Sequence, residues 1–251
     1  IAPSLPGYGF SEASAAAIGP AAMAGMFSRL MREVLGFDRF VVQGGDWGSI
    51  IAGRMALDHP QGLAALHLNM APLRPDLGPG TPPLSDEEQA WLKQAQAARQ
   101  KESAYQEIQS TKPQSLAHGL TDSPAGLAAW IIEKFHGWSD PGADEPPFTM
   151  DQLLTNLTIY WATGSIYSAI WLYRGLREEG SFSLGPGQRI TQPLGFCLPP
   201  NDLIPPPPAS WLARLGNVER DTRLKSGGHF TALQKGPELI EDVRAFFRPL
   251  R

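Results

Sequence analysis

The segment from residue 40 to residue 52 constrains the fold of this chain more than any other. Residues 40–42 are apolar, residues 44–48 read Gly-Gly-Asp-Trp-Gly, and a second apolar stretch begins at residue 50. This pattern predicts a strand, a sharp turn and a helix, with Asp46 at the tip of the turn. Small residues at 44 and 48 would let the strand and the helix approach closely around a strained turn. The segment is typical of a nucleophile elbow, and an ordinary Asp-Gly turn is the alternative reading.

A carboxylate nucleophile restricts the chemistry that such a site performs. Asp46 would attack an electrophilic carbon and form an alkyl ester, and a water activated by a base would then hydrolyse that ester. Ser49 lies three residues beyond the tip, inside the predicted helix, which disfavours a serine esterase.

Composition places the chain among ordinary globular proteins. It has 251 residues, a net charge of −4 and 42% hydrophobic residues, which is enough for a sizeable core. The mild acidity argues against a nucleic-acid partner. Cys197 is the sole cysteine, which excludes an intrachain disulfide framework and a cysteine-based zinc cluster. Because no apolar run reaches membrane-spanning length and no signal-peptide pattern opens the chain, we expect a cytoplasmic protein.

The order of the predicted elements indicates an α/β fold. Residues 1–4 resemble the tail of a strand, residues 23–35 repeat apolar side chains at helical spacing, and residues 65–70 form another predicted strand. Together with the segment at 40–52, they alternate strand and helix, which predicts a mostly parallel sheet. Two further strands are expected near 190–198 and 217–225, and a final helix from Pro237.

A helical insertion interrupts this core in the predicted organisation. Residues 72–83 are rich in proline and glycine, and residues 85–178 contain helical patterns without a convincing strand. Ser85 with Glu88 and Thr149 with Gln152 are capping-box signals, the second following a Pro-Gly-rich loop at 140–147. We therefore predict core segments at 1–72 and 185–251 and a helical cap at 73–184. Such a cap would lie over the carboxyl ends of the strands, where these sheets bind ligands.

Two later residues complete a candidate catalytic triad. His229 lies in Ser-Gly-Gly-His-Phe, after a predicted strand, and Asp202 lies in Pro-Pro-Asn-Asp, after the preceding strand. The order nucleophile, acid, histidine is that of the α/β-hydrolases. Asp202 would orient the His229 ring and stabilise its protonated form. Taken singly, His229 is equally compatible with a turn histidine and Asp202 with a cap residue.

The chain resembles the microsomal-type epoxide hydrolases of the α/β-hydrolase superfamily along nearly its whole length. The segments that carry the resemblance are residues 2–11, 43–51, 108–116, 120–131, 153–156, 160–161 and 226–230. The long matches in the predicted cap are more specific than the triad, which many hydrolases share.

The resemblance implies further site residues and a reaction. Two cap tyrosines of that family bind the epoxide oxygen, and the match assigns these roles to Tyr105 and Tyr173, with Tyr160 and Tyr167 as rival candidates. A phenol is protonated near neutral pH and can donate a proton to a developing alkoxide. The backbone N–H of Trp47 is the expected oxyanion donor. The resemblance implies a small-molecule epoxide substrate and requires neither a metal nor an organic cofactor; a homodimer stays open.

The chain departs from the family pattern near its start. The family has an upstream His-Gly-x-Pro loop that supplies a second oxyanion donor, and this chain begins after its expected position. The letters His-Gly-Trp-Ser at 136–139 resemble the loop but fall in the predicted cap. The strand stub near Ile1 and the strand at 40–45 would also leave an empty slot between them, with unpaired backbone groups. We therefore expect the chain to be a piece of a longer enzyme.

Two other functions compete with epoxide hydrolysis. A haloalkane dehalogenase also uses an aspartate at the elbow, and the indole N–H of Trp47 would there help to bind halide. An inactive, truncated hydrolase is the second rival, because the second oxyanion donor is lacking, although Asp46, Asp202 and His229 are all intact.

Overall fold

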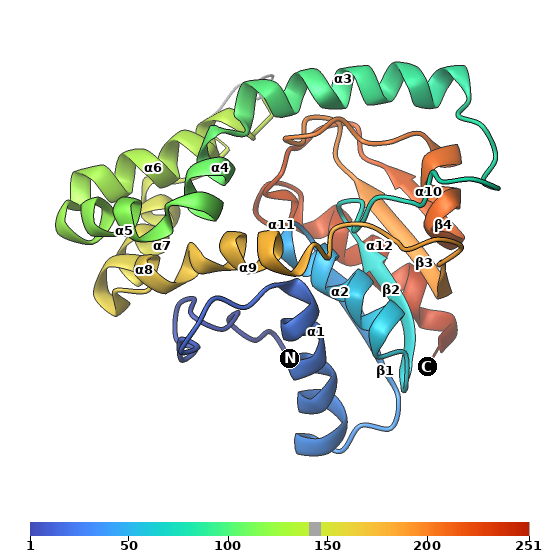
Figure 1. The fold of residues 1–251 in the computed structure, drawn as a ribbon, viewed down its shortest axis with the longest axis horizontal. Helices are drawn as coiled ribbons and strands as arrows, with labels where there is room; N and C mark the ends of the chain where they lie inside the picture. The colour runs from blue at the N-terminus through green and yellow to red at the C-terminus, as the bar shows by residue number, and fades with distance from the viewer. Residues whose placement is uncertain (141–146, 251) are drawn as a thin grey trace.

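A computed structural model describes residues 1–140 and 147–250 of the chain. Its described residues contain a parallel sheet in the order β1-β2-β3-β4 (Figure 1). The strands are β1 (Phe40–Gly44), β2 (Leu63–Leu68), β3 (Ile190–Leu198) and β4 (Gly216–Arg223). The predicted α/β fold with a parallel sheet is confirmed. Since the strands are parallel, the loops that follow them all leave the same edge of the sheet.

Helices cover both faces of this sheet, and successive residues of each strand face opposite layers. On one face lie α1 (Pro20–Arg29), the short π-helix η1 (Leu30–Val34) and α2 (Trp47–Asp58). Leu66 and Leu68 of β2 belong to the apolar cluster that includes α2. His67, between them, points to the other face, where it meets α12 (Gly236–Phe247). This alternation is the period of two that a strand buried on both faces requires.

Helices fill the chain between β2 and β3, as predicted for residues 85–178. They are α3 (Asp86–Glu102), α4 (Ala104–Thr111), α5 (Pro113–Asp122), α6 (Pro124–Gly137), α7 (Met150–Thr163), α8 (Ile166–Ala169) and α9 (Trp171–Glu179). Figure 1 shows α4 to α8 gathered beside the sheet and α3 running across the top of the view. None of the described helices is long and apolar enough to cross a membrane.

The helical region has a small apolar cluster of its own. Leu120, Leu127, Ile166 and Ile170 are at most 5% exposed and pack together, separately from the sheet cluster. Arg74 and Ser183 form an isolated bridge near the two ends of the predicted insertion. The domain limits at 72/73 and 184/185 themselves stay a prediction.

Local signals located the helix starts well. The capping boxes Ser85/Glu88 and Thr149/Gln152 are both present, with each side chain bonded to its partner's backbone N–H. The Pro-Gly-rich loop predicted at 140–147 falls largely on residues 141–146, which lie outside the described part of the chain. The remaining short helices are α10 (Ala209–Leu215), α11 (Thr231–Gln234) and the 3-10 helix η2 (Arg248–Leu250).

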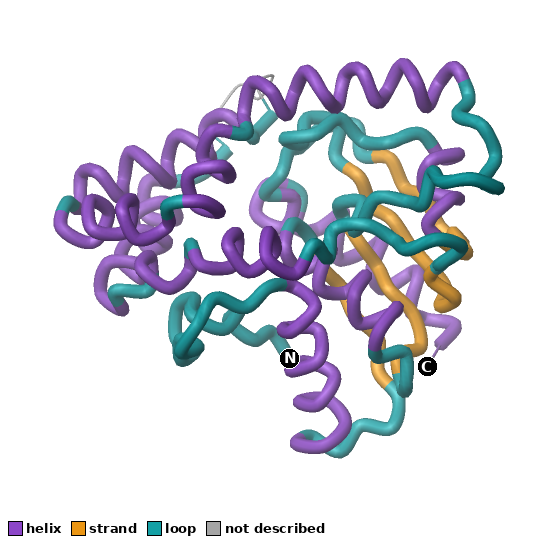
Figure 2. Tube along the Cα trace, in the orientation of Figure 1, coloured by secondary structure: helices purple, strands orange, loops and turns teal. Residues whose placement is uncertain are grey.

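The strand expected at residues 1–4 is wrong. Residues 1–19 are loop (Figure 2), and α1 begins at Pro20. A strand exists only where its backbone joins a ladder, and β1 pairs only with β2 within the described residues. Among residues 1–140 and 147–250, no strand lies beside the apolar start of the chain, so its pattern alone does not make it a strand.

Candidate active site

Three predicted residues meet at the carboxyl edge of the sheet. Asp46 follows β1, Asp202 follows β3 and His229 follows β4. They are far apart in sequence, and the parallel order of the strands brings their loops together.

The turn at Asp46 has the strained geometry that the sequence predicts. Asp46 has φ 46° and ψ −125° and is the one non-glycine residue with a positive φ among the described residues. A Cβ at Gly44 would clash with the backbone of Gly48, and one at Gly45 with the side chain of Asn69. The space around the Cβ position of Gly48 is open, so close packing requires glycine at 44 and 45 rather than at 48.

Ser49 has a structural role behind the elbow. It is fully buried, and its hydroxyl donates to the carbonyl oxygen of Gly44 at 2.9 Å. Its oxygen is therefore directed at the backbone of the strand, which agrees with the expectation that Ser49 is not a nucleophile.

His229 lies between the two carboxylates. Its Nδ1 is 2.7 Å from Oδ1 of Asp202, and its Nε2 is 3.9 Å from Oδ1 of Asp46. The Asp202 oxygen also accepts the backbone N–H of Leu203 at 2.6 Å. Asp202 thus orients the ring so that Nε2 faces Asp46.

The two carboxylates determine the charge of the histidine. Burial by itself lowers the pKa of His229, but the hydrogen bond with Asp202 and the charges of Asp46 and Asp202 outweigh it and raise the pKa to about 9. The Asp46 side chain is 54% exposed, but the space it faces is a protein-lined cavity. The surrounding protein raises the pKa of Asp46, and His229 and the Trp47 N–H act in the opposite direction.

Trp138 and Asp140 hold the histidine loop in place, and the sequence analysis did not identify either role. The carbonyl oxygen of Trp138 accepts the backbone N–H of His229 at 2.8 Å, and its ring lies 5.1 Å from the imidazole. The Asp140 carboxylate accepts the N–H of Gly227 at 2.9 Å and the side-chain amide of Asn201 at 3.0 Å. Residues 136–139 lie in the helical region, as expected. One of them, Trp138, nevertheless lines the site.

A cavity of about 210 Å³ lies between Asp46 and the helices. Four tyrosines line it: Tyr8, Tyr105, Tyr160 and Tyr173. Both predicted tyrosines are therefore at the cavity, and so is the rival Tyr160. Tyr167 instead packs with Trp171 and His118 inside the helical region, at 5.9 and 6.2 Å between ring centroids.

Tyr105 and Tyr173 lie side by side in the cavity that Asp46 lines. Their ring centroids are 5.7 Å apart, and the two rings meet edge to face. Burial, followed by the charge of Asp46 for Tyr105 and by Tyr105 for Tyr173, raises the pKa of both phenols. Both hydroxyls therefore keep their protons at neutral pH and are available as donors.

Tyr8 is the site residue for which the sequence offered the weakest signal. Gly7 and Gly9, both with positive φ, flank it and turn the loop, and Ser168 of α8 donates to the carbonyl oxygen of Gly7 at 2.6 Å. Burial and the charges of Tyr160 and Asp46 raise the pKa of Tyr8. The repeated glycines around a tyrosine were the available signal.

Trp47 contributes two groups to the site. Its backbone N–H bonds to the Asp46 carboxyl group, which is the position expected of an oxyanion donor. Its ring meets Tyr173 edge-on with centroids 4.8 Å apart, and a hydrogen bond from the side chain lowers the pKa of that phenol slightly against the larger effect of burial.

Within the described residues, no group of three or more His, Cys, Asp or Glu side chains is suited to hold a metal ion.

Known proteins resemble this chain along almost its whole length. The profile of the alpha/beta hydrolase fold family matches residues 1–117. Epoxide hydrolase 1 of Sus scrofa is 35% identical over 268 residues, which cover 98% of this chain. The structure of the Aspergillus niger epoxide hydrolase is 32% identical, has a TM-score of 0.83 and covers 99% of this chain and 63% of its own. The chain therefore has the α/β-hydrolase fold.

The curated proteins to which the chain is most similar in sequence include several epoxide hydrolases. The juvenile hormone epoxide hydrolase of Bombyx mori is a further one, 33% identical over 97% of this chain. The predicted resemblance is confirmed. The chain spans 59% of the length of the Sus scrofa protein and 57% of the Bombyx mori protein.

Proposed function

We propose that this chain carries the active site of an epoxide hydrolase, which adds water to an epoxide and releases a vicinal diol. The observation that supports this most strongly is that Tyr105 and Tyr173 line the same cavity as Asp46. A nucleophile and two protonated phenols in one cavity suit a substrate whose ring carbon is attacked while its oxygen takes a proton.

The first step forms an ester. A carboxylate oxygen of Asp46 attacks an epoxide carbon from the side opposite the ring oxygen, and the carbon–oxygen bond of the ring breaks. The ring oxygen takes a proton from the hydroxyl of Tyr105 or Tyr173, which leaves a phenolate. The product of this step is a hydroxyalkyl ester on Asp46.

The second step hydrolyses that ester. Neutral His229 takes a proton from water through Nε2, and the water oxygen attacks the carboxyl carbon of Asp46. The Trp47 N–H stabilises the oxyanion that forms there. When the ester bond breaks, the departing alkoxide takes the proton from His229, and the remaining water proton returns through solvent to the phenolate. The sum is an epoxide plus water giving a diol.

The charges of the site support the assignment of Asp46 as the nucleophile and His229 as the base. Asp46 raises the pKa of His229 in the free enzyme, and an ester on Asp46 carries no charge. Ester formation therefore lowers the pKa of His229 and favours the neutral imidazole at the moment when a base is needed. Residues 73–184 would act as the cap that supplies the tyrosines and excludes bulk water.

Haloalkane dehalogenation is less well supported than epoxide hydrolysis. Halide binding would need space beside the Trp47 indole, whereas the Tyr173 ring packs edge-on against that side chain, with centroids 4.8 Å apart. The tyrosine pair also has no role in displacing a halide, which leaves without a proton.

The decisive experiment traps the ester. A His229→Gln variant is incubated with styrene oxide, quenched, and measured by intact mass and peptide mapping. We expect a gain of one substrate mass on the peptide that contains Asp46, because this variant retains the first step and lacks the base of the second. His118→Gln, at an exposed position of α5, is the matched control and should turn over without accumulating an adduct.

Two outcomes would contradict the proposal. A folded His229→Gln protein with no adduct would argue for an inactive chain, and an adduct formed only with 1-chlorohexane would indicate dehalogenation. Circular dichroism on the same samples establishes that each variant is folded.

Substituting the phenols tests their role separately. Tyr105→Phe and Tyr173→Phe should each slow ester formation by about 100-fold, because a positioned proton donor contributes roughly 10²–10⁴-fold and the second phenol remains. Tyr167→Phe, outside the cavity, should leave the rate unchanged. Rapid-quench mass spectrometry in the His229→Gln background measures this step directly. Equal rates in all three variants would remove the tyrosines from the mechanism.

A further inference from the structure

A second cavity adjoins the candidate active site on the other side of Asp202 and does not include Asp46 or His229. It has a volume of about 550 Å³, and no residue that lines it also lines the cavity at Asp46. Its walls come from residues 70–77 after β2, from α3, from residues 182–183 and from residues 198–211 between β3 and α10. The proposed hydrolysis does not use this space.

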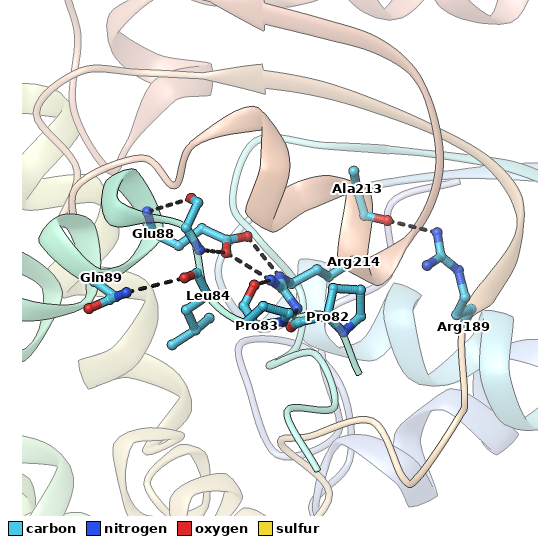
Figure 3. A network of polar contacts seen from close by, with 9 residues as sticks. Pro82, Pro83, Leu84, Glu88, Gln89, Arg189, Ala213 and Arg214 are labelled. Carbon is cyan, nitrogen blue, oxygen red and sulfur yellow. Dashed lines mark hydrogen bonds and ion pairs between the residues drawn. The ribbon is translucent and has the colours of Figure 1, made fainter. Parts of the chain in front are cut away.

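Polar contacts hold the walls of this cavity in place. Arg214 of α10 bonds to both carboxylate oxygens of Glu88 at 2.7 and 2.8 Å, and to the carbonyl oxygens of Pro82 and Pro83 (Figure 3). Glu88 is only 1% exposed and lies in the first turn of α3. These bonds fasten the start of α3 to α10, so the two walls keep their spacing.

Aromatic side chains add an apolar lining to this frame. The indole N–H of Trp91 donates to the carbonyl oxygen of Pro205 at 2.8 Å, and its ring lies 4.8 Å from that of Trp211. Leu73, Leu92 and Ile204 also line the space. An apolar cavity of this volume is within the range of ordinary small-molecule sites, roughly 300–1,000 Å³.

Two arginines face this apolar space without a counter-charge. Arg74 and Arg99 both line the cavity, and neither guanidinium has a hydrogen bond or ion pair to any described residue. The guanidinium of Arg74 lies over the Phe182 ring, 5.3 Å from its centroid. Burial and the positive charge of Arg74 lower the pKa of Arg99. Two nearby cations, of which Arg99 is half-buried and Arg74 exposed, favour the binding of an anion at the mouth of the cavity.

Asp202 also lines the cavity but does not neutralise the arginines. Its carboxylate oxygen is 2.7 Å from His229 and accepts the N–H of Leu203. Its negative charge is therefore paired with His229 and does not compensate the two arginines.

We propose that this cavity binds an amphipathic organic anion, with a carboxylate on Arg74 and Arg99 and a hydrocarbon chain along the apolar walls. The chain would lie against Trp91, Trp211 and the leucines, and the two guanidiniums would each offer a charge-assisted hydrogen bond. This site is distinct from the one at which the epoxide would react.

The test compares a charged ligand with its neutral counterpart. Calorimetric titration of the protein with decanoate should give saturable binding, and 1-decanol should bind more weakly. Arg99→Gln and Arg74→Gln should each weaken decanoate about tenfold, since a hydrogen bond to a charged group is lost, and should leave decanol unchanged. Arg32→Gln, at an exposed position of η1, is the matched control and should change neither affinity.

Two further variants locate the binding. Gln96→Trp, at an exposed position of α3 that lines the cavity, should weaken decanoate and decanol alike by filling the space. Asp46→Asn should leave decanoate binding unchanged, because Asp46 lines the other cavity. Thermal melts of each variant establish that it is folded.

Several results would overturn the proposal. These are the absence of saturable decanoate binding, an equal loss in Arg32→Gln, full binding in Gln96→Trp, or a loss of binding in Asp46→Asn. Because no turnover is measured, the result does not depend on whether the protein hydrolyses epoxides.

Discussion

Two histidine–aspartate pairs of nearly equal length occupy different parts of this molecule. His229 lies 2.7 Å from Asp202 beside the candidate active-site cavity. His67 lies 2.8 Å from Asp242 in the core, where β2 meets α12. The geometry of the pair does not distinguish them, whereas their surroundings do.

The carboxylate of the core pair has further polar partners, whereas Nδ1 of His67 is buried without one among the described residues. Asp242 also accepts the Nε and Nη2 groups of Arg220 at 2.8 and 2.5 Å and the hydroxyl of Thr222 at 2.7 Å. His67 is completely buried, and burial lowers its pKa despite the hydrogen bond with Asp242. Its ring is therefore neutral at pH 7 and joins strand to helix.

The pair at the cavity lies in a different electrostatic environment. Asp202 has no arginine among its hydrogen-bond partners, and a second carboxylate, Asp46, lies 3.9 Å from the other ring nitrogen. The pKa of His229 is raised to about 9. The comparison teaches that neighbouring charges, rather than the pair itself, decide whether a histidine is suited to exchange protons or to hold two elements together.

The largest expected difference is in activity. His229→Gln should lower the rate of epoxide turnover by at least about 10³-fold, because the base of the second step is removed. His67→Gln should leave the turnover number of the folded protein within about twofold, because this pair lies on the far face of β2. Steady-state diol formation on samples matched for folded content measures both. Comparable losses in the two variants would contradict the distinction.

The next largest effect is on stability, where the core pair should matter more than the pair at the cavity. Asp242→Asn should lower the free energy of unfolding by about 3 kcal/mol, because it leaves Arg220 without a buried counter-charge. Asp202→Asn should cost about 1 kcal/mol or less, since it loses mainly one hydrogen bond. Urea unfolding followed by circular dichroism compares them. If Asp202→Asn proved the more destabilising of the two, the structural role assigned to the core pair would be wrong.

A smaller effect concerns the pKa values of the two rings. In the free protein, His229 should titrate near 9 and His67 below its ordinary value of 6.5. Asp46→Asn should lower the pKa of His229, as ester formation would, and leave that of His67 unchanged. NMR titration of the imidazole protons measures both rings in one sample. An unaltered His229 pKa in Asp46→Asn would refute the proposed influence of the nucleophile's charge.

The smallest effect is the pH dependence of stability, and its sign differs between the pairs. The folded state raises the pKa of His229, so its contribution is complete below about 6.5 and is lost as the pH rises through about 9. The folded state lowers the pKa of His67, so its contribution is present above 6.5 and is lost as the pH falls.

Unfolding curves of His229→Gln and His67→Gln between pH 5 and pH 10, each subtracted from wild type, separate these contributions. The difference for His229→Gln should shrink as the pH rises, and that for His67→Gln should shrink as the pH falls. Parallel curves would show that the two histidines are in equivalent electrostatic environments.

Much of the candidate site was predictable because its signals are local. The glycines before Asp46, the capping boxes at Ser85 and Thr149 and the glycines before His229 act within a few residues of themselves. The rest was not predictable from such signals. Tyr8 and Trp138 reach the cavity through contacts with segments more than 90 residues away, such as the bond between Ser168 and Gly7.

By itself, the sequence determined that strands alternate with helices, that the turn at Asp46 is sharp, and that helices fill the chain between β2 and β3. These properties follow from side-chain periodicity and from the conformational preferences of single residues. Only the tertiary structure decided which aspartate accompanies which histidine, that residues 1–4 form no strand, and that Arg74 and Arg99 face one apolar cavity. Pairing, burial and uncompensated charge depend on distances between segments remote in sequence, and no local pattern specifies those distances.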